Sequence, residues 1–137
     1  AYIYLIYGMH CCLNFVTEPE GEPSAVLLRG LEPVYGAEQM SQLRYGKPLA
    51  QLTSYQKKNF LNGPGKCCRA LGLTRAENGL NLIGDELFVC DGPEDIGLPP
   101  ASPGPYSIHT GKRIGIDYAE EAVDFPWRFW LERTDLC

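Results

Sequence analysis

The sequence lacks the C-x-x-C spacing that begins most zinc sites, although it contains six cysteines. They stand in adjacent pairs or alone, at Cys11, Cys12, Cys67, Cys68, Cys90 and Cys137. Adjacent cysteines cannot easily bond to each other, so the pattern also disfavours a disulfide framework. We therefore interpret the cysteines as buried free thiols and expect no metal.

Long hydrophobic runs are also missing. No run approaches the roughly 20 apolar residues of a membrane-spanning helix. Residues 1–13 are interrupted by Gly8 and His10 and have no basic flank or cleavage signature of a signal peptide. We expect an intracellular protein with no membrane partner. The 137 residues, 45% of them hydrophobic, suffice for one domain with its own core. The abrupt apolar start and aromatic end suggest that this domain is truncated.

Acidic residues are absent between Gln39 and Ala76, although the chain has a net charge of -5. The same stretch contains seven basic residues, which are Arg44, Lys47, Lys57, Lys58, Lys66, Arg69 and Arg75. Such an asymmetry favours a basic face for a polyanion. On charge alone, an ordinary solvated surface is equally well supported.

The order of apolar and turn-forming residues predicts an α+β fold with a mainly antiparallel curved sheet. Residues 2–6 and 11–16 are predicted to form a protruding β-hairpin, and residues 24–28 a third strand. Short helices are predicted at 35–44 and 62–72, with Pro64 in a first turn and Gly72 as a C-terminal cap. Further strands are predicted at 86–90, 113–116 and 127–131, and an exposed loop at 97–105.

The hairpin combines aromatic rings with an amide. If its loop holds an odd number of residues, Tyr2, Tyr4, Cys12 and Asn14 share one face and Tyr7 lies at the tip. A ring can stack on a planar base and an amide can read its edge, as a flipped base requires. A large residue at a turn tip can also wedge between base steps. A tyrosine-rich sheet face with only a structural role is the alternative.

Residues 62–66 (NGPGK) open the second predicted helix inside the basic stretch. Exposed backbone N–H groups and Lys66 would suit a phosphate, whereas helix capping without a ligand is the alternative. His10 and His109 stand apart, and no Ser or Cys has an adjacent base. The residues alone therefore do not assemble an active site.

Five blocks of sequence, in order, resemble the alkyladenine (3-methyladenine) DNA glycosylase family. These are residues 2–14 (YIYLIYGMHCCLN), 25–33 (AVLLRGLEP), 63–71 (GPGKCCRAL), 113–122 (RIGIDYAEEA) and 127–130 (WRFW), which extend over nearly the whole chain. The resemblance implies a monofunctional enzyme, without cofactor or metal, that acts as a monomer on double-stranded DNA containing a damaged purine. Its substrates would be of the 3-methyladenine, 7-methylguanine, hypoxanthine and ethenoadenine class. The implied fold is similar to the C-terminal domain of methionyl-tRNA formyltransferases.

The resemblance also implies roles for residues of the hairpin. Tyr7 would enter the minor groove in place of the flipped nucleotide, with Met9 and His10 beside it. Tyr4 would stack on the flipped base, and Asn14 would exclude the extra amino group of guanine. Leu27 and Cys12 would complete the base pocket.

Other matched residues would contact the phosphates or the attacking water. Arg29 matches an arginine near both, and Ile114 a residue whose carbonyl holds the water. Lys66, Gly65 and Arg44 are the implied phosphate contacts.

In the family, the general base is a glutamate in a Glu-x-Tyr motif N-terminal to the hairpin, and this sequence contains no such motif. We therefore expect this chain alone to bind DNA weakly and to lack excision activity. Two alternatives remain open: a non-catalytic nucleic-acid-binding module of the same fold, and a structural or protein-binding domain.

Overall fold

The computed structural model describes residues 1–100 and 105–134. Their contacts divide the chain into two units, Ala1–Asp91 and Gly92–Cys137, and each unit is described separately. Residues 101–104 of the predicted loop and Cys137 lie outside the described residues. The assignment of the whole chain to one domain stays a prediction.

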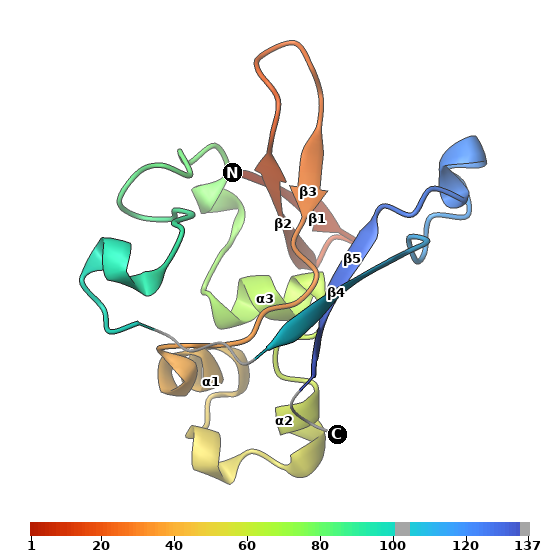
Figure 1. Cartoon of the computed structure of the whole chain (residues 1–137). Coiled ribbons are helices and arrows are strands. Elements are labelled where there is room, and N and C mark those ends of the chain that lie inside the picture. The colour runs from red at the N-terminus through yellow and green to blue at the C-terminus, as the bar shows by residue number, and fades with distance from the viewer. Residues whose placement is uncertain (101–104, 135–137) are drawn as a thin grey trace. The chain divides into compact units, whose positions relative to one another are not determined.

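A three-stranded antiparallel sheet forms the first part of unit 1 (Figure 1). It comprises β1 (Tyr2–Ile6), β2 (His10–Val16) and β3 (Ala25–Leu27), in the order β1-β2-β3. The predicted hairpin and third strand are therefore confirmed. These segments are rich in aromatic and branched residues, which favour extended backbone.

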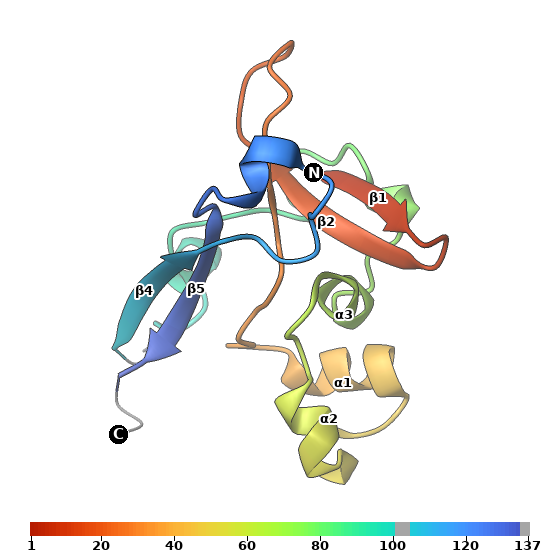
Figure 2. The same cartoon turned by 90° about the vertical axis from the view of Figure 1, so that its right-hand side faces the viewer.

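Helix α3 (Pro64–Ala70) packs between this sheet and helix α1 (Ala37–Tyr45), as Figure 2 shows. Cys68 joins Ile3 and Leu13 in one buried cluster against the sheet. On its other side, α3 contributes Cys67 and Ala70 to a second cluster with Leu52, Phe60 and Leu61. The helix is therefore held from two sides, which fixes its first turn relative to the hairpin.

The helix boundaries follow from glycine, proline and capping residues. Helix α1 ends at Gly46, whose φ of 64° is in the left-handed region, and α3 begins with Pro64. The C-terminal cap of α3 is Leu71, and Gly72, which was predicted as the cap, follows it with a left-handed φ of 69°. Helix α2 (Ser54–Lys58) was not predicted and begins with a capping box formed by Thr53 and Gln56. Short 3-10 helices occupy Leu49–Gln51, Arg75–Glu77, Pro93–Ile96 and Glu120–Val123.

The outer edge of β1 is bonded to a loop segment. The backbone N–H of Gly79 donates to the carbonyl of Ala1 at 3.0 Å, and Ile3 N–H donates to Asn78 Oδ1 at 2.7 Å. Backbone groups on an edge strand otherwise remain unpaired. The start of β1 is thus covered.

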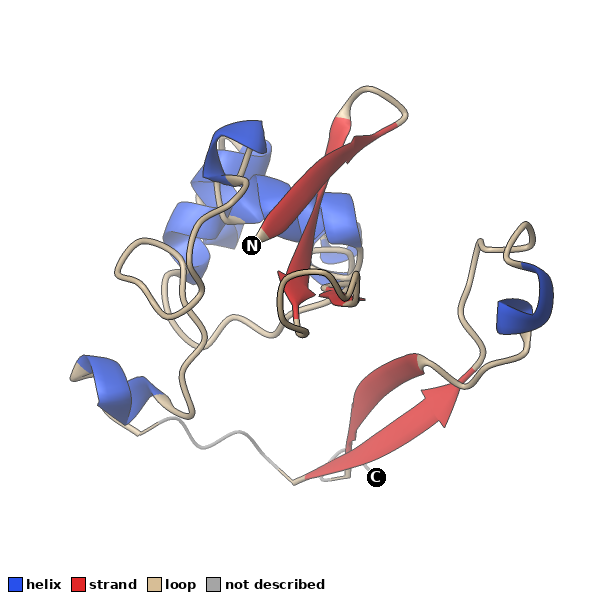
Figure 3. Ribbon diagram, turned by 90° about the horizontal axis from the view of Figure 1, so that it is seen from above, coloured by secondary structure: helices blue, strands red, loops and turns tan. Residues whose placement is uncertain are grey.

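Unit 2 contains an antiparallel pair, β4 (Tyr106–Gly111) and β5 (Arg128–Arg133), joined by a long connection (Figure 3). The imidazole of His109 stacks on Trp130 and lies 3.0 Å from the Glu132 carboxylate. Strand β5 confirms the prediction for 127–131, shifted by one or two residues, whereas β4 was missed.

Two predicted strands are wrong. Residues 113–116 lie in the connection after β4, where Gly115 adopts a left-handed φ of 72° that interrupts extended backbone. Residues 86–90 form only an isolated bridge, between Ile83 and Phe88. The α+β class, with antiparallel strands and a few short helices, is nevertheless confirmed. The likeness to formyltransferase domains stays a prediction.

The cysteines of the described residues are free thiols. Cys12, Cys67 and Cys68 are buried as expected, and Cys11 is partly buried. The expectation is wrong for Cys90, which is exposed because its segment joins no sheet. In the same described ranges, no helix has the length and apolar character needed to cross a bilayer.

Burial raises the pKa of the Cys68 thiol from 9.0 to about 11. Because the folded pKa lies above the unfolded one, the neutral thiol stabilises the fold fully below pH 9, and this contribution is lost as pH rises through 11. Its size is on the order of 2 kcal/mol. We predict that Cys68→Ala reduces the fall in unfolding free energy between pH 9 and 11, measured by urea denaturation. Cys90→Ala is the control, and parallel curves for both variants would contradict the prediction.

Candidate nucleic-acid interface

The register of the β1–β2 hairpin decides which side chains share a face. Tyr2 pairs with Asn14, Tyr4 with Cys12 and Ile6 with His10. The loop therefore contains three residues, Tyr7 to Met9, which meets the condition of an odd number. Leu27 of β3 pairs with Asn14, which places it on the same face. The four residues predicted for the base pocket, Tyr4, Cys12, Asn14 and Leu27, are thus brought to one face of the sheet.

The predicted wedge residues project from the hairpin tip. Tyr7 is 85% exposed and Met9 is 72% exposed. Tyr7 has a φ of 52°, in the left-handed region that costs a non-glycine residue about 1 kcal/mol or more. The exposed Tyr7 ring makes no stabilising contact with the core, although its backbone is strained. Binding to a partner accounts for such a residue better than packing does.

The amide of Asn14 is fixed by the backbone. Its Nδ2 group donates to the carbonyls of Tyr2 at 3.2 Å and Cys12 at 3.3 Å, and the residue is only 7% exposed. Both amide N–H bonds are thereby used, so Oδ1 is the remaining polar atom. The amide forms a rigid part of the sheet face.

Tyr4 and Cys12 are joined through their side chains. Burial raises the pKa of the Cys12 thiol, the nearby Cys11 adds to this, and a hydrogen bond with Tyr4 opposes it. The Tyr4 ring also lies 5.6 Å from that of Tyr2, at 33°. Cys12 is fully buried, so within this structure it supports the Tyr4 ring instead of lining an open surface.

Gly65 connects the first turn of α3 to the hairpin. A side-chain carbon at this position would lie 3.2 Å from Cβ of His10, the first residue of β2. That distance is shorter than an ordinary contact, so glycine permits the close approach. His10 and Gly65 are therefore neighbours, and Lys66 follows directly.

The ammonium of Lys66 is bound by two amide oxygens. Its Nζ lies 2.7 Å from Asn62 Oδ1 and 3.3 Å from Asn59 Oδ1. Neither asparagine was predicted as a site residue. Their spacing after the basic residues of α2 and before Lys66 is the signal that could have indicated them.

Arg44 has a structural role in this arrangement. Its guanidinium donates to the carbonyls of Asn59 and Phe60 and lies 4.4 Å from the Tyr45 ring centroid. It thereby binds carbonyl groups just beyond the end of α2. Its contact with a phosphate stays a prediction.

The remaining predicted residues are exposed. Arg29 follows β3, and within the described ranges its guanidinium makes no ion pair or hydrogen bond. Ile114 is an exposed residue of unit 2 and is placed only with that unit. The contact of the Ile114 carbonyl with the attacking water stays a prediction.

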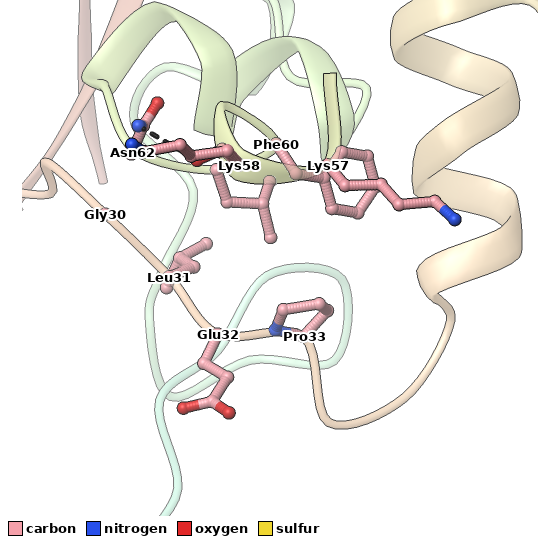
Figure 4. A pocket seen from close by; sticks show the side chains of 9 residues that line it. Gly30, Leu31, Glu32, Pro33, Lys57, Lys58, Phe60 and Asn62 are labelled. Atoms are coloured by element: carbon pink, nitrogen blue, oxygen red, sulfur yellow. Dashed lines mark hydrogen bonds between the residues drawn. The ribbon is translucent and has the colours of Figure 1, made fainter. Parts of the chain in front are cut away.

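An open cavity of about 380 Å³ lies elsewhere in unit 1 (Figure 4). It separates residues 30–33 from Lys57, Lys58 and residues 60–62. None of the predicted base-pocket residues lines it, so we do not equate it with that pocket. The described residues also contain no group of three or more His, Cys, Asp or Glu side chains placed to hold a metal ion.

The exposed hairpin tip allows a stability prediction. Tyr7→Ala should change the free energy of unfolding by less than about 0.5 kcal/mol, because the ring leaves solvent only slightly. Gly8→Ala should cost about 1 kcal/mol, since Gly8 has a φ of 70°. Urea denaturation measures both. A loss from Tyr7→Ala larger than that from Gly8→Ala would show that the ring stabilises the fold.

Comparison with known proteins identifies relatives over nearly the whole chain. Residues 1–135 match the profile of the family described as Methylpurine-DNA glycosylase (MPG). The chain is 50% identical over 132 residues to a protein of Clostridium perfringens (strain 13 / Type A), and 52% identical over 134 residues to one of Bacillus cytotoxicus. Both carry the name "Putative 3-methyladenine DNA glycosylase". The matches include 96% and 98% of this chain but 61% and 63% of the relatives.

Proposed function

Because the chain belongs to the methylpurine-DNA glycosylase family, we propose that it supplies the DNA wedge and base-pocket wall of a DNA repair enzyme. The enzyme would hydrolyse the N-glycosidic bond of alkylated or deaminated purines in double-stranded DNA. The observation that carries this proposal is the hairpin register, which puts Tyr4, Asn14 and Leu27 on one face and Tyr7 at the exposed tip. A DNA substrate also implies an intracellular location.

In this proposal, Tyr7 enters the minor groove and occupies the space left by the flipped nucleotide. Flipping costs a few kcal/mol and costs least for a damaged base, which provides part of the selectivity. The wedge offsets this cost by replacing lost base stacking. Because the turn already fixes the backbone of Tyr7, only its side chain has to be ordered on binding.

The pocket wall selects the base. The Tyr4 ring offers a π-face, which attracts alkylated purines further because they are cationic. The Asn14 amide is fixed by two carbonyl groups, so it cannot turn aside for an additional amino group such as that of guanine. Rigidity at Asn14 would therefore convert a small difference in base shape into a loss of binding.

The chemical step requires a water molecule and a general base. The water oxygen attacks the sugar carbon, its proton passes to the base, and the purine leaves with the electrons of the broken bond. The residues of this chain would assist by position: Arg29 at the phosphate and water, and the Ile114 carbonyl at the water. Without a lysine nucleophile among the matched blocks, we propose no strand cleavage through a Schiff base.

The proposal predicts that the hairpin tyrosines are required for release of the base. In the complete gene product, Tyr7→Ala and Tyr4→Ala should each reduce single-turnover release of 3-methyladenine by about tenfold or more, an effect of at least 1.4 kcal/mol on the barrier. Tyr118→Ala is the control, because Tyr118 is a similarly exposed tyrosine outside the hairpin. Equal rates for Tyr7→Ala and the unsubstituted protein would contradict the wedge.

The 137-residue chain on its own should bind duplex DNA without releasing the base, because it contains no candidate general base before β1. The measurement is release of 3-methyladenine by the purified chain, compared with its Tyr4→Ala variant. Release above that variant would contradict the assignment of the base. DNA binding without release by the complete gene product would instead favour a non-catalytic module.

A further inference from the structure

Lys66 is a cation whose protein partners are neutral. Its ammonium lies 2.7 Å from Asn62 Oδ1 and 3.3 Å from Asn59 Oδ1. No Asp or Glu occurs between Gln39 and Ala76. The ion pairs of the described ranges are elsewhere, at His109–Glu132 and Lys112–Asp124. The Lys66 ammonium is therefore held in position by amide oxygens, and no carboxylate among the described residues neutralises its charge.

The orientation of both amides is set by the end of helix α2. Asn59 Nδ2 donates to the Tyr55 carbonyl at 3.0 Å, and Asn62 Nδ2 donates to the Lys58 carbonyl at 3.2 Å, a bond drawn in Figure 4. Lys58 is the last residue of α2, where a backbone acceptor lacks an intrahelical partner, whereas the Tyr55 carbonyl also accepts from the backbone N–H of Asn59 at 3.0 Å. Since the amide nitrogens bind these carbonyls, both amide oxygens face Lys66, and Asn59 Oδ1 also accepts from Asn62 Nδ2 at 3.3 Å.

The ammonium retains capacity for an anion. It has three N–H bonds, of which the two amide oxygens accept two. Lys112 offers the contrast, because its Nζ lies 2.5 Å from a carboxylate oxygen of Asp124. A lysine held by carboxylate attracts phosphate weakly, whereas a lysine held by amides keeps its full charge and a fixed position.

We propose that Asn62, together with Asn59, is a positioning residue that holds the Lys66 ammonium for a phosphate oxygen of duplex DNA. The inference rests on the proposed function, which identifies the polyanion as DNA. It adds residues that act through Lys66 and do not themselves contact the phosphate. Gly65, the neighbour of Lys66, lies against His10 of the hairpin, so the phosphate contact is near the wedge.

The test is the salt dependence of binding to an undamaged fluorescent duplex, measured by anisotropy with the chain and its variants. Lys66→Ala should weaken binding about tenfold at low salt and reduce the slope of log K against log salt by about 0.9. Asn62→Ala should weaken binding about fivefold, because the lysine gains conformational freedom. In the Lys66→Ala background, Asn62→Ala should have no further effect.

Two matched variants serve as controls. Gln42→Ala removes an exposed amide in the same acid-free stretch, and Lys112→Ala removes a lysine that already has a carboxylate partner. Neither should alter the slope. Asn62→Asp keeps the side-chain shape but pairs Lys66 with a carboxylate, so it should flatten the slope as Lys66→Ala does.

An equal loss from Asn62→Ala with and without Lys66 would overturn the inference, because the role would then be structural. An unchanged slope in Asn62→Asp, or undiminished binding in Lys66→Ala, would also overturn it while leaving the proposed function intact. Absence of duplex binding by the unsubstituted chain would reject the proposed function itself, and the inference with it.

Discussion

The packing of strand β2 on helix α3 is the contact on which the candidate interface depends. Leu13 is buried there against Cys68. Because side chains alternate along a strand, burying Leu13 places its neighbours Cys12 and Asn14 on the opposite face. The same contact brings the beginning of β2 against Gly65. One buried cluster therefore determines the pocket wall, the position of the hairpin and its approach to Lys66.

Three cations of the described residues illustrate different kinds of partner. Carbonyl oxygens bind Arg44, amide oxygens bind Lys66, and a carboxylate binds Lys112. The first two lie in the stretch without acidic residues. Since neutral oxygens orient a cation without cancelling it, an acidic chain can still present a locally positive surface. Net charge alone would have excluded this possibility.

The sequence was sufficient to predict features that depend on a few neighbouring residues, such as a turn or the beginning of a helix. Tyr7 was placed at the hairpin tip, and Pro64 indicated where a helix begins. Residues 113–116 have the composition of a strand, but Gly115 interrupts it in a way that composition does not reveal. Residues 86–90 form no strand because a strand requires a partner, which is a property of tertiary structure.

The candidate site was only partly predictable for a similar reason. Because side chains alternate along a strand, an assumed odd loop length was enough to place Tyr4 and Asn14 on one face. The role of each residue in binding the base came only from the family resemblance. Helix α2 has only five residues and no apolar periodicity, so it was not predicted, and the two amides that follow it were not assigned to Lys66. The carbonyl partners of Arg44 depend on how separate segments pack together, which spacing does not reveal.

The loop segment bonded to β1 has a consequence for how the molecules behave at high concentration. Sheets whose outer strands expose long rows of backbone groups tend to recruit strands from other molecules. Here the hydrogen bonds from Gly79 and to Asn78 occupy the start of one outer strand, and the other, β3, has only three residues. Neither border of this three-stranded sheet offers a long template, so the addition of a strand from another molecule to it is disfavoured.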